Sequence, residues 1–353
     1  MACQTARKDF HKLEHFSLRL RTLLLLVLLP PLGNIRAQGP ETSAEPSRRA
    51  GFQVAANAAP AGCSVFGVTG TGSVAEACNR IAQAFSAGDL ERARHYANLF
   101  RTQHSTQGAG FYWLGQIDFK EFKYISALRN FEASVDLSPA VAAAHVALAL
   151  CYASIYQYRL FEKEMLRVLD QTPADPLPYY HLGRYYFLQL DQPERGANYL
   201  QKALDRNPED YRSSYYLGYY HEVNGNRDTA KTLYTKASTA VRAQKTQFGA
   251  PFEGMSRLML LEDRLPEAIR FAQEALSTEP DSASARLRLG KLWVQSGNFE
   301  RGIKELQKAI ELDPTEAAPY YQLSRAYLKV GKQSEAQSAQ SRFLKVRSVY
   351  SGE

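Results

Sequence analysis

Proline recurs at a nearly constant interval through most of this chain. Pro139, Pro173, Pro208, Pro280 and Pro314 are separated by 34, 35, 72 and 34 residues, and 72 is two steps of 34 plus four. A fixed period of about 20 to 50 residues is typical of solenoids, in which each unit packs only against its neighbours. The spacing therefore predicts an array of repeated units with an extended surface that can bind other chains.

Three further columns of residues share this period. When each unit is numbered so that its proline falls at position 32, positions 8, 20 and 27 hold mainly Gly, Ala and Ser. The frame needs one extra residue near Asp191 and four between Ala237 and Gly249. Two antiparallel helices can cross closely only where the facing side chains are small, and proline ends a helix because it lacks an N–H. Each unit is therefore predicted to be a helix–turn–helix.

The unit at 283–316 carries the fullest version of the pattern: Leu289, Gly290, Trp293, Gly297, Leu306, Ala309 and Pro314. It resembles the tetratricopeptide repeat, a 34-residue helix–turn–helix. The resemblance implies an all-α fold, an α-solenoid of antiparallel helix pairs wound as a right-handed superhelix. It also implies a non-catalytic protein that binds proteins or peptides. Eight units are predicted, at 74–107, 108–141, 142–175, 176–210, 211–248, 249–282, 283–316 and 317–350.

The chain before the array divides into two parts. In residues 1–37 basic residues precede an apolar run at 23–29, which Pro30 and Pro31 interrupt. This pattern predicts a signal peptide cleaved near Ala37, which would export the chain to the periplasm or the cell exterior. The alternative is an uncleaved signal that anchors the chain, although the run is shorter than the ~20 residues of a membrane span. Residues 38–73 are rich in small and polar residues and are predicted to be a flexible linker.

The net charge of the chain argues against nucleic acid as a partner. The formal charge is +7, but residues 1–37 hold six Lys or Arg and two Asp or Glu, which is +4 of that total. The mature chain would therefore carry about +3, too little for the strong basic field that nucleic-acid binding uses. No membrane span is predicted in the mature chain.

The cysteines and histidines suggest no catalytic or metal site. Cys63 and Cys78 are 15 residues apart, and in an oxidising compartment they could form a disulfide between the linker and the first unit; two unpaired thiols are the alternative. Cys151 is interpreted as a small buried hydrophobic residue. The five histidines after residue 37 show none of the usual metal-ligand spacings, and His11 and His15, four residues apart, lie in the predicted signal peptide. We expect no cofactor, no metal and no enzymatic activity.

The resemblance also implies where a partner would bind. In tetratricopeptide arrays the first helix of each unit lines the concave groove, with positions 5 and 9 pointing into it, and these are neighbours on one helical face. The alternative for each tyrosine is packing against the next unit. The basic residues suggest a partner segment that bears carboxylates. The predicted partner-binding residues are Tyr112, Gln116, Tyr180, Arg184, Tyr215, Tyr219, Arg257, Lys291, Tyr321 and Arg325.

Three functions are consistent with the sequence. The favoured one is a scaffold that holds a protein or peptide segment in the concave groove. The second is a self-associating structural or envelope-assembly component, and the sequence leaves the oligomeric state open. The third is a small-ligand sensor or enzyme accessory, which needs a closed pocket near the insertion at 246–249.

Overall fold

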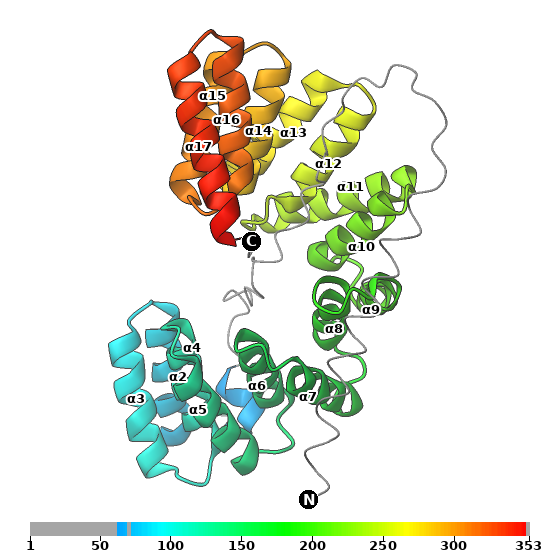
Figure 1. Cartoon of the computed structure of the whole chain (residues 1–353). Helices are drawn as coiled ribbons and strands as arrows, with labels where there is room; N and C mark the ends of the chain where they lie inside the picture. The colour runs from blue at the N-terminus through cyan, green and yellow to red at the C-terminus, as the bar shows by residue number, and fades with distance from the viewer. Residues whose placement is uncertain (1–61, 69–71, 351–353) are drawn as a thin grey trace, which may run out of the picture. The chain divides into compact units, whose positions relative to one another are not determined.

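The computed structural model describes residues 62–68 and 72–350, and within these ranges the chain is helical, with no strand. The predicted signal peptide and residues 38–61 of the predicted linker lie outside the described residues. A short 3-10 helix, η1 (Cys63–Phe66), precedes sixteen α-helices, α2 to α17. The all-α solenoid expected from the repeat frame is confirmed, and Figure 1 shows the helices following one another in pairs.

The helices form eight pairs, each with a first and a second helix that pack against each other. The first helices are α2 (Ser73–Ser86), α4 (Gly108–Lys120), α6 (Ala142–Ser154), α8 (Pro176–Leu188), α10 (Tyr211–Val223), α12 (Ala250–Leu261), α14 (Ala283–Gln295) and α16 (Ala317–Lys329). The second helices are α3 (Leu90–Gln103), α5 (Tyr124–Leu137), α7 (Tyr158–Gln171), α9 (Pro193–Arg206), α11 (Arg227–Gln244), α13 (Leu265–Thr278), α15 (Phe299–Leu312) and α17 (Gln333–Tyr350).

The small residues at positions 8 and 20 let the two helices of a pair cross closely. A Cβ added to Gly196 of α9 would lie 2.8 Å from the carbonyl oxygen of Gly183 of α8, closer than any real contact. Where position 8 is serine, the hydroxyl spans the crossing: Ser256 Oγ donates to the Ala268 carbonyl at 2.8 Å. The columns seen in the sequence are therefore the contact points of each helix pair.

The repeating prolines connect successive units as well as ending helices. A proline has no N–H, but its carbonyl still accepts a hydrogen bond. At four joints between units, the side chain at position 4 of the following unit lies within hydrogen-bonding distance of the proline carbonyl. The contacts are His145 Nε2 to Pro139 O at 2.9 Å, Tyr179 Oη to Pro173 O at 3.2 Å, Arg286 Nη2 to Pro280 O at 2.8 Å, and Tyr320 Oη to Pro314 O at 3.2 Å. The proline period thus marks the joint between units.

The turn inside every unit contains one residue with a positive φ. Glycine adopts this left-handed conformation without steric cost, whereas a residue with a Cβ is destabilised by roughly 1–2 kcal/mol. Two of the eight residues are bulky aromatics, which makes their turns unusual. The residues are Gly88, Phe122, Tyr156, Asp191, Gly225, Asp263, Gly297 and Gly331, with φ of 79°, 60°, 62°, 52°, 78°, 57°, 82° and 76°.

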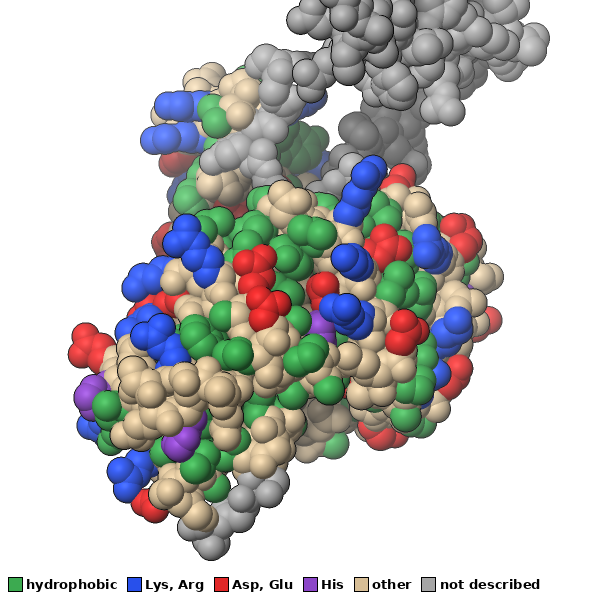
Figure 2. Space-filling view, turned by 90° about the horizontal axis from the view of Figure 1, so that it is seen from below, with side chains coloured by type: hydrophobic (Ala, Val, Ile, Leu, Met, Phe, Trp, Pro, Cys, Tyr) green, Lys and Arg blue, Asp and Glu red, His purple; other side chains and the backbone are tan. Residues whose placement is uncertain are grey.

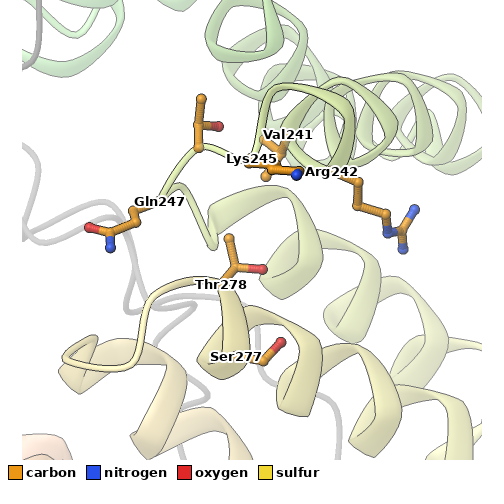
Figure 3. Close-up of a pocket in the computed structure, with 7 residues that line it drawn as sticks. Val241, Arg242, Lys245, Gln247, Ser277 and Thr278 are labelled. Carbon is orange, nitrogen blue, oxygen red and sulfur yellow. The ribbon is translucent and has the colours of Figure 1, made fainter.

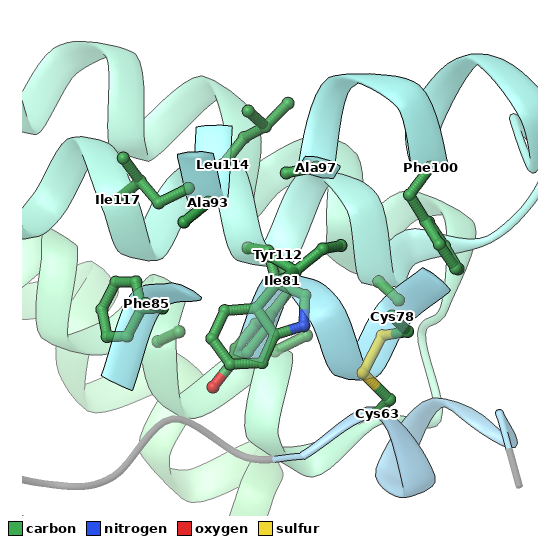
Figure 4. Close-up of a cluster of buried hydrophobic side chains, with 14 of the residues drawn as sticks. Cys63, Cys78, Ile81, Phe85, Ala93, Ala97, Phe100, Tyr112, Leu114 and Ile117 are labelled. Atoms are coloured by element: carbon green, nitrogen blue, oxygen red, sulfur yellow. A yellow bond between two sulfur atoms is a disulfide. The ribbon is translucent and has the colours of Figure 1, made fainter. Parts of the chain in front are cut away.

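The last part of the predicted linker is folded onto the first units. A disulfide joins Cys63 of η1 to Cys78 of α2, with the two Cα atoms 5.9 Å apart (Figure 4). The ring of Phe66 packs on that of Tyr112 in α4, with centroids 5.1 Å apart. Residues 62–68 therefore differ from the flexible linker that composition predicted, because the disulfide, the aromatic contact and the burial of Val68 hold this short segment in place.

The four-residue insertion is absorbed without loosening the array. It lengthens α11 to 18 residues, and Lys245 then ends the helix in the left-handed conformation. Phe248, which follows, packs its ring against Tyr211 and Tyr215 of α10, with centroids 5.3 and 5.5 Å away. Among the contacts between consecutive units, the packing of α7 against α8 is the least extensive.

Candidate protein-binding surface

The first helices of the units form a common face. Contacts join α2 to α4, α4 to α6, α8 to α10, α10 to α12, α12 to α14, and α14 to α16. Positions 5 and 9 of these helices, which the sequence assigned to a partner, fall on or beside those contacts. Their surroundings differ sharply along the chain.

Four of the predicted tyrosines are buried by packing within the array. Tyr112 lies under Phe66, and Tyr180 lies against Tyr216 with ring centroids 6.2 Å apart. Tyr215 and Tyr219 are buried in the core cluster that spans α10 to α14. These side chains correspond to the packing alternative, because aromatic rings at this spacing fill the space between successive first helices. Gln116 is half-buried on α4.

Arg184 is also enclosed. Its guanidinium hydrogen-bonds the hydroxyls of Tyr180 and Tyr216, and it lies over the Tyr216 ring, 5.9 Å from the centroid. The neighbouring His181 is buried, and this burial, with the positive charges of Arg184 and Arg212, lowers its pKa to about 3. The imidazole is therefore uncharged at neutral pH. This cluster stabilises the junction of α8 and α10 and presents little to a partner.

Arg257, which the sequence assigned to a partner's carboxylate, pairs with a carboxylate of its own chain. Its Nε and Nη2 donate to the two oxygens of Glu222 in α10, both at 2.7 Å, and Nη2 also lies 3.1 Å from the Tyr234 hydroxyl. The side chains of Arg257 and Glu222 are only 19% and 11% exposed. Bidentate pairs of this kind are strong and geometrically specific.

A second pair, absent from the predicted residues, continues this polar line into the next unit. Arg288 Nε of α14 lies 3.5 Å from a carboxylate oxygen of Glu253 in α12, whose other oxygen accepts from Ser284 at 2.8 Å. Burial, and then the charge of Arg257, lower the pKa of Arg288. In both pairs glutamate precedes arginine by 35 residues, one repeat plus one. A search for opposite charges at that spacing would have found them.

The remaining predicted residues lie at the surface of the last two units. Lys291 of α14 and Tyr321 and Arg325 of α16 are exposed. The Arg325 guanidinium lies over the Tyr321 ring, 5.7 Å from its centroid, and the other neighbour of that ring is Phe343 of α17 at 5.5 Å. Of the predicted residues, these three are best placed to contact another molecule.

A shallow hollow of about 220 Å³ lies at the insertion. Val241 and Lys245 at the end of α11 face Ser277 and Thr278 of α13 across it (Figure 3). Ligand pockets usually hold 300 to 1,000 Å³ and are mainly apolar, so this hollow gives little support to the small-ligand hypothesis.

The described surface carries mixed charge. On the face in Figure 2, basic and acidic side chains are interspersed, with apolar side chains between them. Among residues 62–68 and 72–350, no group of three or more metal-ligating side chains gathers, and no helix is long and apolar enough to cross a membrane. Cys151 is buried, and burial raises the pKa of its thiol to about 12. That shift makes it a poor nucleophile.

Known proteins match this chain in its repeats. Three tetratricopeptide-repeat family models match, two described as "Tetratricopeptide repeat" at residues 182–242 and 259–310 and one as "TPR repeat" at 290–331. "Tetratricopeptide repeat protein 37" of Xenopus laevis is 25% identical over 182 residues, which cover 49% of this chain and 11% of that protein. The chain thus spans about a tenth of that relative's length.

Solved structures show the same fold. The "APC/C hetero-tetramer Cut9-Hcn1" matches with a TM-score of 0.61 and 18% identity, over 70% of this chain and 48% of that one. A tetratricopeptide repeat protein from Parabacteroides merdae matches with a TM-score of 0.55 and 16% identity, over 72% of this chain and 98% of that one. Proteins with this fold typically mediate protein–protein interactions and are generally non-catalytic. From its repeat frame, its paired helices and these matches, the chain is a tetratricopeptide repeat protein.

Proposed function

We propose that this protein is a non-catalytic scaffold that binds a carboxylate-bearing protein or peptide segment on the first helices of its last two units. The observation that carries the proposal is the exposure of Lys291, Tyr321 and Arg325, in contrast to the buried tyrosines and the less exposed arginines at equivalent positions nearer the N-terminus. Tyrosine and arginine are also the residue types that dominate binding hot spots.

The charge of these two helices supports an acidic partner. Helices α14 and α16 contain Arg286, Arg288, Lys291, Arg325 and Lys329 and no Asp or Glu. Arg286 is paired with Glu305 at 2.9 Å, and Arg288 approaches Glu253. The other three cations, Lys291, Arg325 and Lys329, are exposed. A carboxylate-bearing segment would gain charge-assisted hydrogen bonds there, with Tyr321 supplying an apolar contact.

The binding surface can be tested with a charge-matched pair of variants. Lys291→Gln with Arg325→Gln should lower recovery of co-purified partners from a cell-envelope extract about tenfold, since a charged hot-spot contact is worth more than 1 kcal/mol. The matched control, Lys304→Gln with Arg342→Gln, removes two cations from the second helices α15 and α17 and should leave recovery unchanged. Recovery is measured by quantitative mass spectrometry of tagged protein. Equal recovery by the groove variant and wild type would contradict the proposal.

We also propose that the chain works outside the reducing cytoplasm. The predicted signal at 1–37 motivates this proposal, and the Cys63–Cys78 pairing supports it, because disulfides persist mainly in oxidising compartments. The closed loop of 15 residues would stabilise the fold by roughly 3 kcal/mol in the chain-entropy model.

Thiol counting tests this second proposal. Unfolded without reductant, the exported chain should expose one alkylatable thiol, Cys151, and after reduction it should expose two more, Cys63 and Cys78. The N-terminus of the same sample, read by mass spectrometry, should lie near Gln38. Three thiols before reduction would show that the disulfide is absent in the exported protein.

A further inference from the structure

Two neighbouring turns carry aromatic side chains where the other turns carry glycine or aspartate. Phe122 and Tyr156 occupy the left-handed position of the turns in the second and third units, with φ of 60° and 62°. Their side chains are 77% and 72% exposed, the two highest exposures among the large hydrophobic residues that the structure describes. Bulky residues in this conformation are strained. An exposed ring makes few packing contacts, so packing does little to offset that strain.

Other apolar side chains extend the exposed surface at both turns. Ile125 lies in the first turn of α5 and Leu160 in the first turn of α7, and both are exposed. Each aromatic ring stands nearly perpendicular to a half-buried one beneath it: Phe122 against Tyr124 at 85°, and Tyr156 against Tyr158 at 87°. Because α4 and α5 contact α6, the two turns occupy equivalent places in adjacent stacked units. We name Phe122, Ile125, Tyr156 and Leu160 the aromatic turn patch.

The exposed charged side chains at these turns are all basic. Within residues 120–125 and 155–160 the exposed charged side chains are Lys120, Lys123 and Arg159, and no Asp or Glu is exposed there. The one acidic residue, Glu121, is half-buried and bound by Arg94 at 2.7 Å and Lys123 at 2.8 Å. The turns of the fourth and sixth units differ, since each exposes acidic side chains, Asp191 and Asp263 among them.

We propose that the aromatic turn patch docks this protein onto an anionic lipid surface. Protruding aromatic and aliphatic side chains surrounded by Lys and Arg suit the boundary between lipid head groups and acyl chains, where apolar burial adds to attraction by anionic lipids. The patch lies on turns and its large side chains are exposed, so they can enter a bilayer interface while the neighbouring cations contact the head groups. It is separate from the cationic face of α14 and α16.

Vesicle sedimentation with the chain recovered from expression of the full sequence tests the proposal. Wild-type protein should sediment with phosphatidylglycerol-containing vesicles at low salt, and less with phosphatidylcholine alone or at high salt. Phe122→Gly with Tyr156→Gly should weaken sedimentation about tenfold and raise the melting temperature, because glycine relieves both strained turns. Arg159→Gln should weaken binding to anionic vesicles only. The matched control, Val223→Ser with Leu261→Ser, removes two exposed apolar side chains from the last residues of α10 and α12, just before the turns of the fifth and sixth units, and should bind like wild type.

A second readout excludes binding through residues 1–37. In Phe122→Trp, the exposed indole should shift its emission to shorter wavelength when anionic vesicles are added. Equal sedimentation of wild type and the double glycine variant, or an unshifted indole, would overturn the proposal. So would a photo-crosslinker at position 122 that captures a polypeptide while the protein ignores vesicles, because the patch would then be a protein-docking surface.

Discussion

Arg257→Ala should destabilise this protein by about 3–5 kcal/mol, because it leaves the Glu222 carboxylate buried without its cation. Among the residues that the structure describes, Tyr234 would remain as the donor to Glu222, through a hydrogen bond of 2.5 Å in the intact protein. The double variant Glu222→Leu with Arg257→Met should be closer to wild type than either single change, since no buried charge is then left unpaired. The change is read from urea unfolding followed by circular dichroism and by Trp293 fluorescence, because Trp293 packs against the same cluster as Tyr234.

The pH dependence of this variant gives an independent check with a defined sign. Burial alone would raise the pKa of Glu222, but the hydrogen bonds and charge of Arg257, together with the bond from Tyr234, hold it below its ordinary value. In wild type this stabilisation is present at neutral pH and is lost as the pH falls through the depressed pKa. Without Arg257, burial should raise the pKa above its ordinary value, so the variant should gain stability relative to wild type between about pH 7 and pH 5.

An arginine in an exposed network serves as the control. Arg264 bonds Glu262 and Glu267 at the surface, just after α12. Arg264→Ala should change the urea midpoint little, since exposed ion pairs are screened by solvent. If Arg257→Ala shifted the urea midpoint no more than Arg264→Ala does, the buried pair would not stabilise the array.

The fold could be predicted from the sequence because the repeated residues lie where helices end and where they cross. Pro139 and Pro173 mark the ends of second helices, and Gly183 and Gly196 mark a helix crossing, so their spacing fixes the helix pairs without knowledge of any other contact. The folded end of the linker lies outside this period, and the sequence suggested the Cys63–Cys78 bond there but not the contact of Phe66 with Tyr112. Its order depends on the Cys63–Cys78 bond and on Phe66 over Tyr112, which are contacts between segments of different composition.

Only part of the candidate site could be predicted, because the position of a residue within a repeat tells which way its side chain points but not how exposed that side chain is. Position 5 holds both Tyr215, which Phe248 of the insertion helps to bury, and Tyr321, which stays exposed near the end of the array. Position 9 holds Arg257, whose partner Glu222 belongs to the preceding unit. Burial at these positions depends on which residues the neighbouring units contribute, and a single repeat does not contain that information.

A second buried carboxylate makes the stability of the junction between the first two units equally sensitive to substitution. The carboxylate of Asp118 in α4 forms an ion pair with Arg94 of α3 at 2.7 Å. It also accepts hydrogen bonds from Ser126 and Asn130 of α5 at 2.5 and 2.8 Å. Its side chain is nearly inaccessible to solvent. Hydrogen bonds to a charged group contribute about 1.5–3 kcal/mol each, and Arg94 keeps Glu121 as a partner. Asp118→Ala should therefore destabilise the N-terminal units by about 3–4 kcal/mol.

The chain's two tryptophans allow this loss to be located. Trp113 lies in the core cluster of the first units, whereas Trp293 lies in α14. In a Trp293→Phe background, Asp118→Ala should lower the urea midpoint seen by Trp113 fluorescence more than the midpoint seen by circular dichroism, because units of a repeat array contact only their neighbours. The matched control is Asp136→Ala, an exposed aspartate on α5, which should move neither midpoint. Equal shifts of both signals would mean that the array unfolds as one cooperative body and that the Asp118 network stabilises all of it.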